Sequence, residues 1–278
     1  MSVIIKRQAS YFFSSDEKNG ASNVQDNGST FSVILNNPIQ IPAGAVNCEI
    51  GVADAQIWYV NPNISADLKN NKFKFTTTVA PAGTYTITFN DGLYSLQELN
   101  ATLSNALVNL GLPANLFLLS GDDATQSTII TILTSGDSVD FTVANSLKDV
   151  LGFNNAVYPA PSANFNQYSP NPAAFNDDNS YLIASNIVST GIPLNNKSFG
   201  ILVNVPINDA PGKQILYEPK HITWSDANQL IGNGRQSLDF FLTNQSQAKV
   251  NTLGEKWQFT LVLRWQMLLT DKQLPLKP

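Results

Sequence analysis

Hydrophobic and polar residues alternate along most of the chain, which is the pattern of β-strands with one buried face. The longest alternating run lies near the C-terminus, where one face carries Trp257, Phe259, Leu261, Leu263, Trp265, Met267 and Leu269. Polar residues occupy the opposite face, namely Gln258, Thr260, Arg264 and Gln266. A long strand with one apolar face must pack against a second sheet or a partner.

Turn signals rich in Asn, Asp, Gly and Pro separate the alternating runs. Five runs follow the middle of the chain, over residues 181–190, 199–207, 215–224, 235–243 and 257–269. With three or four runs in the first part of the chain, the total is eight or nine strands. This number predicts a mainly β fold, an antiparallel β-sandwich of the single jelly-roll type.

One segment departs from this pattern and predicts a helix. Ser95 and Glu98 have the spacing of a capping box. An apolar stripe follows, formed by Leu96, Leu99, Leu103, Ala106, Leu107 and Leu110. Gly111 and Pro113 then end the helix.

The helix and the short runs around it predict a small inserted module. We expect an α+β module over residues 84–153, because this segment combines strands, a helix and a helical turn that ends at Gly152. Residues 1–83 would then hold the first jelly-roll strands. Residues 154–278 would hold a linker, rich in Pro, Asn and Ala, and the remaining strands.

The composition indicates a surface made mostly of neutral polar groups. Charged residues form 13% of the chain, against about 25% in typical soluble domains. Neutral amides and hydroxyls lose water at modest cost when each finds a partner. This suits a protein covered by neighbours, although a secreted β protein would have a similar composition.

The charge balance excludes a broad attraction to nucleic acid or to acidic membranes. The net charge is −5, which repels polyanions. Lys6 and Arg7 are too few for a nucleic-acid arm. No segment is long and apolar enough to predict a membrane span, and the first apolar run is too short for a secretory signal.

Candidate catalytic and metal-binding residues are scarce. His221 is the single histidine and Cys48 the single cysteine, which excludes a disulfide framework and a zinc site with several such ligands. No G-x-S-x-G motif supplies a nucleophile for His221, so we interpret His221, on the predicted strand 215–224, as structural or interfacial. Cys48 alternates in phase with Ile50 and Val52, which predicts a core position.

The acidic residues do not form a recognisable site. Glutamate is limited to Glu17, Glu49, Glu98, Glu218 and Glu255, which disfavours a glycosidase pair. The pairs Asp122-Asp123 and Asp177-Asp178 lack the ligand spacing of a calcium loop. Gly232 and Gly234 have no helix after them to present a phosphate. We therefore predict no enzyme, and no catalytic, cofactor-binding or metal-binding residues.

Several segments resemble the vertex (penton) capsid proteins of virophages and Polinton-like viruses. FNDGLYSLQELNATLSNAL, STIITI, VDFTV and SLKDVLGF are similar to an inserted module of these proteins. YLIASNIVSTG, FGILVNVPI, QILYEPKHITW and LGEKWQFTLVLRW are similar to the closing half of their single jelly roll. Together these stretches and their surroundings cover roughly 70% of the chain.

The resemblance implies a structural role in a virion. It implies a homopentamer at an icosahedral vertex, next to trimers of the major capsid protein. Because no secretory signal is predicted, we expect synthesis in the host cytoplasm. A host receptor is a further partner to consider, whereas no specific nucleic acid and no catalytic residue come with the family. The sequons at Asn63, Asn100 and Asn244 are then by-products of composition.

Two rival interpretations predict different features. A viral fibre, spike or carbohydrate-binding jelly roll would be trimeric and would use exposed aromatics such as Trp58 or Tyr59 as a sugar platform. A lyase or hydrolase on a β scaffold would have a cleft lined by carboxylates.

Overall fold

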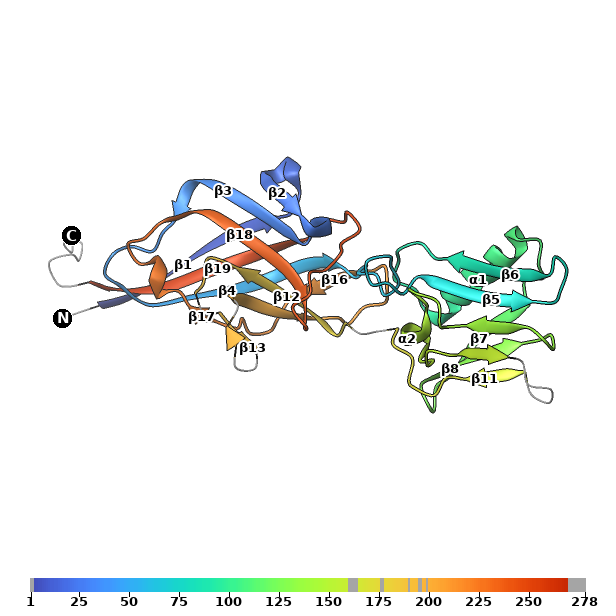
Figure 1. Cartoon of the computed structure of the whole chain (residues 1–278). Helices are drawn as coiled ribbons and strands as arrows, with labels where there is room; N and C mark the ends of the chain where they lie inside the picture. The colour runs from blue at the N-terminus through green and yellow to red at the C-terminus, as the bar shows by residue number, and fades with distance from the viewer. Residues whose placement is uncertain are drawn as a thin grey trace. The chain divides into compact units, whose positions relative to one another are not determined.

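The computed structural model describes residues 3–159, 165–175, 178–189, 191–194, 197–198 and 200–269. The chain forms two compact units, each with its own sheets (Figure 1). Unit 1 comprises residues 1–60 and 178–278, and unit 2 comprises residues 61–177.

The described residues of unit 1 form two large antiparallel sheets and one short hairpin. Sheet A has the order β1 (Val3–Ser14), β19 (Gln258–Leu269), β4 (Ala45–Trp58) and β16 (Gln214–Tyr217), with β17 (Ser225–Asp226) also paired to β4. Sheet B has the order β15 (Ile201–Pro206), β12 (Ser180–Ser185), β18 (Arg235–Asn244), β3 (Thr30–Ile39) and β2 (Ala21–Gln25). Smaller elements complete unit 1, namely the hairpin β13 (Pro193–Leu194) and β14 (Lys197–Ser198), and the 3-10 turns η1 (Glu17–Asn19), η2 (Asp26–Gly28) and η3 (Asn228–Leu230).

The strand pairs of unit 1 are nested. β1 pairs with β19, β3 with β18, β4 with β16 and β17, and β12 with β15. The chain therefore runs as one long hairpin that is folded across two sheets, which is the jelly-roll topology. The predicted fold class is confirmed, and unit 2 is inserted between β4 and β12.

Aromatic rings from both sheets form the centre of the unit 1 core. The Phe240 ring of sheet B lies 4.6 Å from Phe13 and 5.1 Å from Phe259 of sheet A, measured between centroids. Phe31 lies 5.0 Å from Trp257, whose Nε1 donates to the carbonyl of Gly28. These contacts join the sheets because alternate residues of each strand face inward.

Two bulges in β4 change which residues face the core. The register with β19 shifts between Thr260 and Leu261 and again between Arg264 and Gln266. Asn47, at the second bulge, has a φ of 53°. As a result Cys48 is 1% exposed, as predicted for a core residue, whereas Val46 is 37% exposed although it shares the same alternation.

The described residues of unit 2 form two small sheets and two helices. One sheet has the order β10 (Val157–Pro159), β9 (Ser138–Asp140), β5 (Lys72–Thr77) and β6 (Gly83–Thr88). The other has the order β11 (Asn166–Tyr168), β8 (Ser127–Ile132) and β7 (Phe117–Asp122). The helices are α1 (Leu96–Asn109) and α2 (Lys148–Leu151).

Helix α1 lies where the sequence predicts it. Ser95 Oγ accepts a hydrogen bond from the Glu98 backbone N–H, and Glu98 Oε2 accepts one from the Ser95 backbone N–H. Both halves of the capping box are therefore present. The buried residues of the helix are Leu99, Leu103 and Leu107, which join the core of unit 2.

Unit 2 is wider than the module expected over residues 84–153. β5 pairs with β6 and β9, and its buried Phe75 lies 4.9 Å from Phe117. β11 pairs with β8, which extends the unit beyond residue 153. The expected limits were too narrow because these pairings join segments that are distant in the sequence and leave no local signal.

Candidate functional site

The outer face of sheet A carries a row of paired polar side chains between β4 and β19. We call this row the polar ladder. Its described pairs are Asn47 Nδ2 to Gln266 Oε1 at 3.0 Å, Arg264 Nε to Glu49 Oε2 at 2.6 Å, Thr260 Oγ1 to Asp54 Oδ1 at 3.1 Å, and Gln258 Nε2 to Gln56 Oε1 at 2.7 Å.

The strand register explains the polar ladder. In β19 the inward residues, such as Phe259 and Leu261, are buried, so their polar neighbours face outward. Antiparallel pairing sets Gln258 opposite Gln56 and Arg264 opposite Glu49. These side chains already form hydrogen bonds with one another. A partner that binds here would therefore lose little side-chain entropy, because the polar side chains are held in place before binding.

A segment without regular structure, residues 218–224, crosses the outer face of sheet A. A Cβ atom added to Gly51 would lie 2.4 Å from Ile222 Cγ2 and 2.7 Å from the carbonyl oxygen of Thr223. The Arg264 guanidinium lies 3.9 Å from the centre of a Trp224 ring, a cation–π contact. Trp224 and Glu49 together therefore fix the Arg264 side chain.

The crossing segment corrects the predicted strand over 215–224. β16 ends at Tyr217 and β17 begins at Ser225, so His221 lies on an exposed irregular stretch and not on a strand. The chain leaves the sheet edge here because it passes over the face at Gly51, where the missing side chain leaves room.

Exposed apolar residues flank the polar ladder on both sides. Phe12 of β1 is 59% exposed and pairs with Thr260, and Leu216 of β16 is 57% exposed and pairs with Gln56. Both residues therefore share the outer face of sheet A with the ladder. One exposed apolar side chain therefore stands on each side of the polar ladder on this face.

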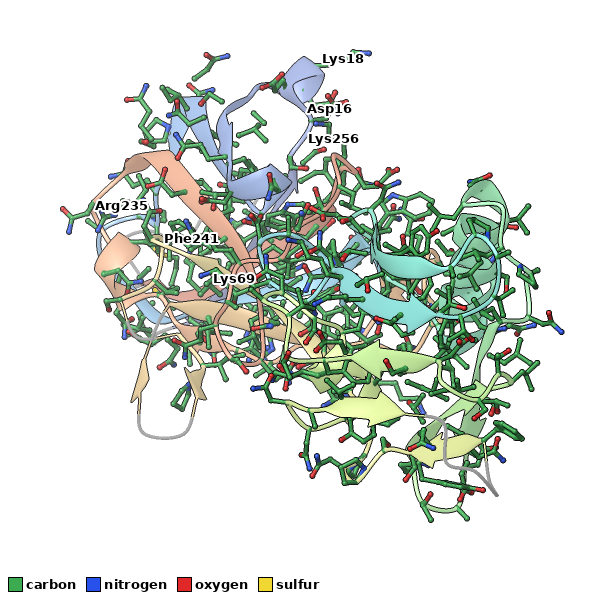
Figure 2. The ribbon with its side chains drawn as sticks, turned by 45° about the vertical axis from the view of Figure 1, so that its right-hand side comes forward. Asp16, Lys18, Lys69, Arg235, Phe241 and Lys256 are labelled. Atoms are coloured by element: carbon green, nitrogen blue, oxygen red, sulfur yellow. The ribbon has the colours of Figure 1, made fainter. Side chains whose placement is uncertain are left out.

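Charge is divided unequally between the units. Unit 1 has 12 Lys or Arg and 12 Asp or Glu residues, whereas unit 2 has 4 and 9. The whole net charge of −5 therefore resides in unit 2. The cations of unit 1 are spread over separate elements, with Lys18 in η1 and Arg235 at the start of β18 (Figure 2).

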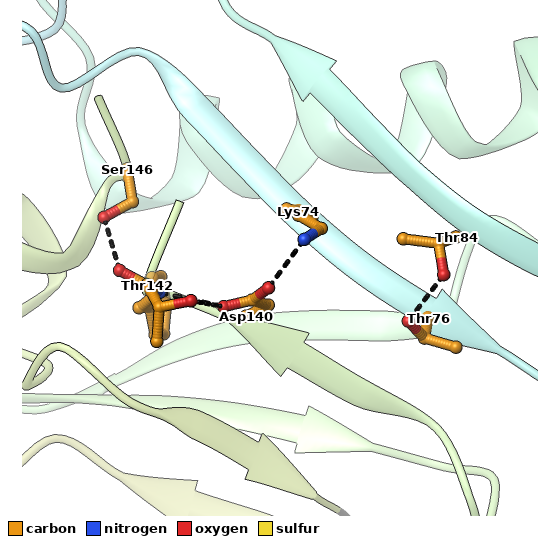
Figure 3. Close-up of polar contacts among 7 residues, drawn as sticks. Lys74, Thr76, Thr84, Asp140, Thr142 and Ser146 are labelled. Carbon is orange, nitrogen blue, oxygen red and sulfur yellow. Dashed lines mark hydrogen bonds and ion pairs between the residues drawn. The ribbon is translucent and has the colours of Figure 1, made fainter. Parts of the chain in front are cut away.

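The polar contacts of unit 2 bind its own strands together (Figure 3). Lys74 Nζ of β5 lies 2.8 Å from Asp140 Oδ2 of β9, and Thr142 Oγ1 donates to Asp140 Oδ1 at 2.6 Å. The hydrogen bond from Lys74, followed by that from Thr142, lowers the pKa of Asp140 to about 2. Thr76 and Thr84 connect β5 to β6 through their hydroxyls at 2.9 Å.

The aromatic pair proposed for a sugar platform does not form one. Tyr59 is 4% exposed and packs against Tyr181 at 6.3 Å between ring centroids. Burial raises the pKa of Tyr59. Tyr59 is therefore a core residue, and the neighbouring Trp58 is half-buried.

Four of the acidic residues that the sequence singled out have separate hydrogen-bond partners. Glu98 caps α1, Glu49 pairs with Arg264, and Asp122 accepts hydrogen bonds from Ala124 and Thr125 in its own turn. Asp178 accepts a hydrogen bond from Asn244, whereas Asp177 lies outside the described residues.

Neither a metal cluster nor a membrane helix is found among the described residues. No three or more His, Cys, Asp or Glu side chains gather there in a way that would hold a metal ion. Nor does that part of the chain contain a helix with the length and hydropathy needed to cross a bilayer.

The sequon asparagines have structural contacts. Asn63 Nδ2 donates to the carbonyls of Tyr94 and Phe175 at 2.8 and 2.9 Å. Asn100 Oδ1 accepts from the Leu119 N–H at 2.7 Å. The Asn63 and Asn100 amides thus connect segments of unit 2 that are distant in the sequence.

Comparison with known proteins gives one type of match. No protein-family model and no curated protein matches the chain. Among solved structures, the crystal structure of selenomethionine-labelled mavirus penton protein is similar, with a TM-score of 0.45 and 10% sequence identity. The alignment covers 95% of this chain and 100% of that chain. A likeness at this level assigns no function.

Proposed function

We propose that the chain is a structural capsid protein that forms the pentameric vertex of an icosahedral virus. The outer face of sheet A carries this proposal, because it combines the polar ladder with exposed Phe12 and Leu216 on a jelly-roll unit of balanced charge. The sequence resemblance to vertex proteins of virophages supports the same role.

The open edges of both sheets support assembly. β1 and β16 are edge strands of sheet A, and β15 and β2 are edge strands of sheet B. Exposed edges invite pairing with other chains unless they are covered. Five copies around an axis, each giving a different surface to the next, would cover these edges and close the contact into a ring.

The neutral charge balance of unit 1 also suits a ring. Five copies of a strongly charged domain would repel one another, whereas a domain with equal numbers of acidic and basic residues avoids this cost. We assign the contacts with sibling copies and with the major capsid protein to unit 1. We assign to acidic unit 2 a separate role, as a plug of the vertex or a contact with a host receptor.

Mass measurement of the purified protein tests the proposal. We expect wild-type protein at micromolar concentration to give a mass of five copies by mass photometry. Thr260→Arg places a long charged side chain on the polar ladder, and we expect it to reduce the pentamer at least tenfold. Thr86→Arg is the matched control, because Thr86 is exposed on β6 of unit 2, and it should leave the pentamer intact.

Two outcomes contradict the proposal. A wild-type protein that stays monomeric would remove the assembly role, and a mass of three copies would favour a viral fibre or spike. Circular dichroism of each variant separates a lost contact from a lost fold.

A further inference from the structure

Two strands, β1 and β16, form opposite edges of sheet A. β1 pairs with β19 over its whole length of 12 residues without a register shift. β16 pairs with β4. Within the described part of the chain neither strand has a pairing partner on its other side, so each edge presents unpaired backbone groups.

The hydrogen bond just beyond β1 shows which backbone groups of this strand face the free edge. The Ser15 N–H donates to the Trp257 carbonyl at 2.9 Å, one pair beyond the end of the β1–β19 ladder. Hydrogen-bonded and non-hydrogen-bonded pairs alternate along an antiparallel ladder. The odd-numbered residues of β1 therefore bond to β19. The N–H and C=O groups of the even-numbered residues, such as Ser10 and Phe12, point to the free edge.

The same alternation identifies the free groups of β16. The Tyr59 N–H donates to the Lys213 carbonyl at 2.8 Å, one pair before Gln214 pairs with Trp58. Every second residue from Lys213 onward therefore bonds to β4. Gln214 and Leu216 direct their N–H and C=O groups to the free edge.

Strand direction favours pairing between these two edges. Each neighbouring pair among β1, β19, β4 and β16 is antiparallel, so β1 and β16 run in opposite directions. A rotation about an axis along the strands that sets β16 of one copy beside β1 of the next therefore gives an antiparallel pair. The edges of sheet B suit this less, because five alternating strands make β15 and β2 run in the same direction. β15 also ends at Pro206, and the register of β2 with β3 shifts.

Exposed apolar side chains at the two edges support the same pairing. Phe12 and Leu216 are 59% and 57% exposed and share the outer face of sheet A. An antiparallel pair with Leu216 opposite Phe12 or Ser10 sets the two apolar side chains directly or diagonally beside each other. This contact would remove both side chains from water.

The charges disfavour pairing of β1 with a second β1. Lys6 and Arg7 are its charged residues, and it has no acidic residue. Two copies of β1 would therefore bring four cations to one junction. β16 has no charged residue, and Glu218 follows it directly, so β16 can pair with β1 without this repulsion.

We propose that β16 of one copy pairs with β1 of the next copy, with Leu216 opposite Phe12 or Ser10. The A sheets of successive copies then join into one antiparallel sheet. The contact is heterologous, because it joins two different edges, and repeated copies can close into a ring. This inference rests on the proposed function, and it names the strands that form the contact between copies.

A proline substitution tests the backbone pairing. Ser10→Pro removes an N–H that faces the free edge and leaves the hydrogen bonds to β19 in place, and an edge strand tolerates proline at such a position. We expect this variant to fold. Its pentamer fraction, measured by mass photometry, should fall at least about tenfold, because every contact in the ring loses a hydrogen bond between copies.

The matched control is Thr86→Pro in β6 of unit 2. Thr86 is exposed, and β6 pairs with β5 alone among the described strands. The Phe89 N–H donates to the Asn71 carbonyl, so the same alternation turns the Thr86 N–H to the free edge of β6. Thr86→Pro should change the pentamer fraction less than about twofold. Circular dichroism and tryptophan fluorescence verify that both variants fold.

Disulfide trapping tests the contact independently of the proline variant. Directly opposed residues of an antiparallel pair have Cα atoms about 4.5–5.5 Å apart, within the range of a disulfide. Leu216→Cys combined with either Phe12→Cys or Ser10→Cys should give covalent multimers of up to five copies on non-reducing electrophoresis. The control combines Leu216→Cys with Tyr11→Cys, whose side chain points to the opposite face of β1, and should give monomers. The native Cys48 is 1% exposed and does not compete.

The outcomes separate this inference from the proposed function. A pentamer that Ser10→Pro leaves intact, or that neither cysteine pair traps, would overturn the inference alone. Equal trapping in the Tyr11 control would overturn it as well. Assembly into a different number of copies, lost in Ser10→Pro and trapped through Leu216, would contradict the vertex role alone. A wild-type protein that stays monomeric and is not trapped would contradict both.

Discussion

Unit 1 and unit 2 have cores of the same kind, but their surfaces are used differently. Both cores are built on phenylalanine, with Phe240 and Phe259 central to one and Phe73 and Phe117 to the other. In unit 1, polar pairs cover an outward sheet face beside exposed apolar residues, and the charges balance. In unit 2, the Lys74–Asp140 pair connects neighbouring strands, and a net charge of −5 remains. A neutral surface permits close packing of copies, and an acidic one opposes it.

The largest expected effect tests whether the two cores are independent. Phe240→Ala should cost unit 1 about 3–5 kcal/mol, because it leaves a cavity among the rings of Phe13, Phe31 and Phe259. Phe117→Ala should cost unit 2 a similar amount. All 4 tryptophans belong to unit 1, so tryptophan fluorescence in urea follows unit 1, and far-ultraviolet circular dichroism follows both units. If both variants instead shift one shared unfolding transition by the same amount, the two units unfold as one cooperative body.

A second variant tests the outer face of sheet A. Gly51→Ala should destabilise unit 1 by about 1–3 kcal/mol, because its Cβ would overlap the backbone of the crossing segment. The control Gly83→Ala meets its nearest neighbour atom, in Tyr85, at 3.4 Å and should change unit 2 by about 0.5 kcal/mol or less. Urea denaturation measures both changes. Equal costs would mean that the crossing segment moves freely.

The capping box offers a local test in unit 2. Ser95→Ala removes the acceptor for the Glu98 N–H and should cost about 1 kcal/mol. Ser104→Ala, within the same helix, is the control and should cost about 0.5 kcal/mol at most. The loss of stability should lower the midpoint of thermal unfolding measured by the helical circular dichroism signal. The unfolding midpoint measured by tryptophan fluorescence, which reports on unit 1, should not change.

The smallest expected effect concerns pH. The pKa of Asp140 is about 2 in the folded chain and 3.8 in its ordinary state, so its contribution to stability is present above pH 3.8 and is lost as the pH falls through 2. Because Lys74 is 33% exposed, we expect this contribution to be less than about 1 kcal/mol. Asp140→Asn should flatten the stability of unit 2 between pH 4 and pH 2, and an unchanged slope would contradict the role of the ion pair.

Local features of the fold could be predicted from the sequence. Helix α1 follows from Ser95, Glu98 and a leucine stripe, all within one short segment. Some strands of unit 1, such as β18 and β19, follow from alternation, whereas the run predicted as one strand over 215–224 divides into β16 and an irregular segment. The limits of unit 2 could not be predicted in this way. They depend on the pairing of β5 with β9 and of β11 with β8, which are distant in the sequence and become neighbours only in the folded protein.

The polar ladder was visible in the sequence only in part. Gln258, Thr260 and Arg264 alternate with apolar residues, which places them on an outward face. Their partners in β4 do not keep that alternation, because the bulges beside Thr260 and Arg264 shift the register. A glycine with a positive φ would have marked the bulge in the sequence. The second bulge of β4 has Asn47 at that position instead, and asparagine gives no such signal.

The outermost nested pair, β1 with β19, sets Val3 directly opposite Leu269. Groups attached at Val3 and at Leu269 would therefore lie at the same end of the sandwich. A short linker between these strands would close the chain into a circle, and new termini opened at the exposed loop of Gly232 and Asn233 would yield a circular permutant with every jelly-roll strand pair intact.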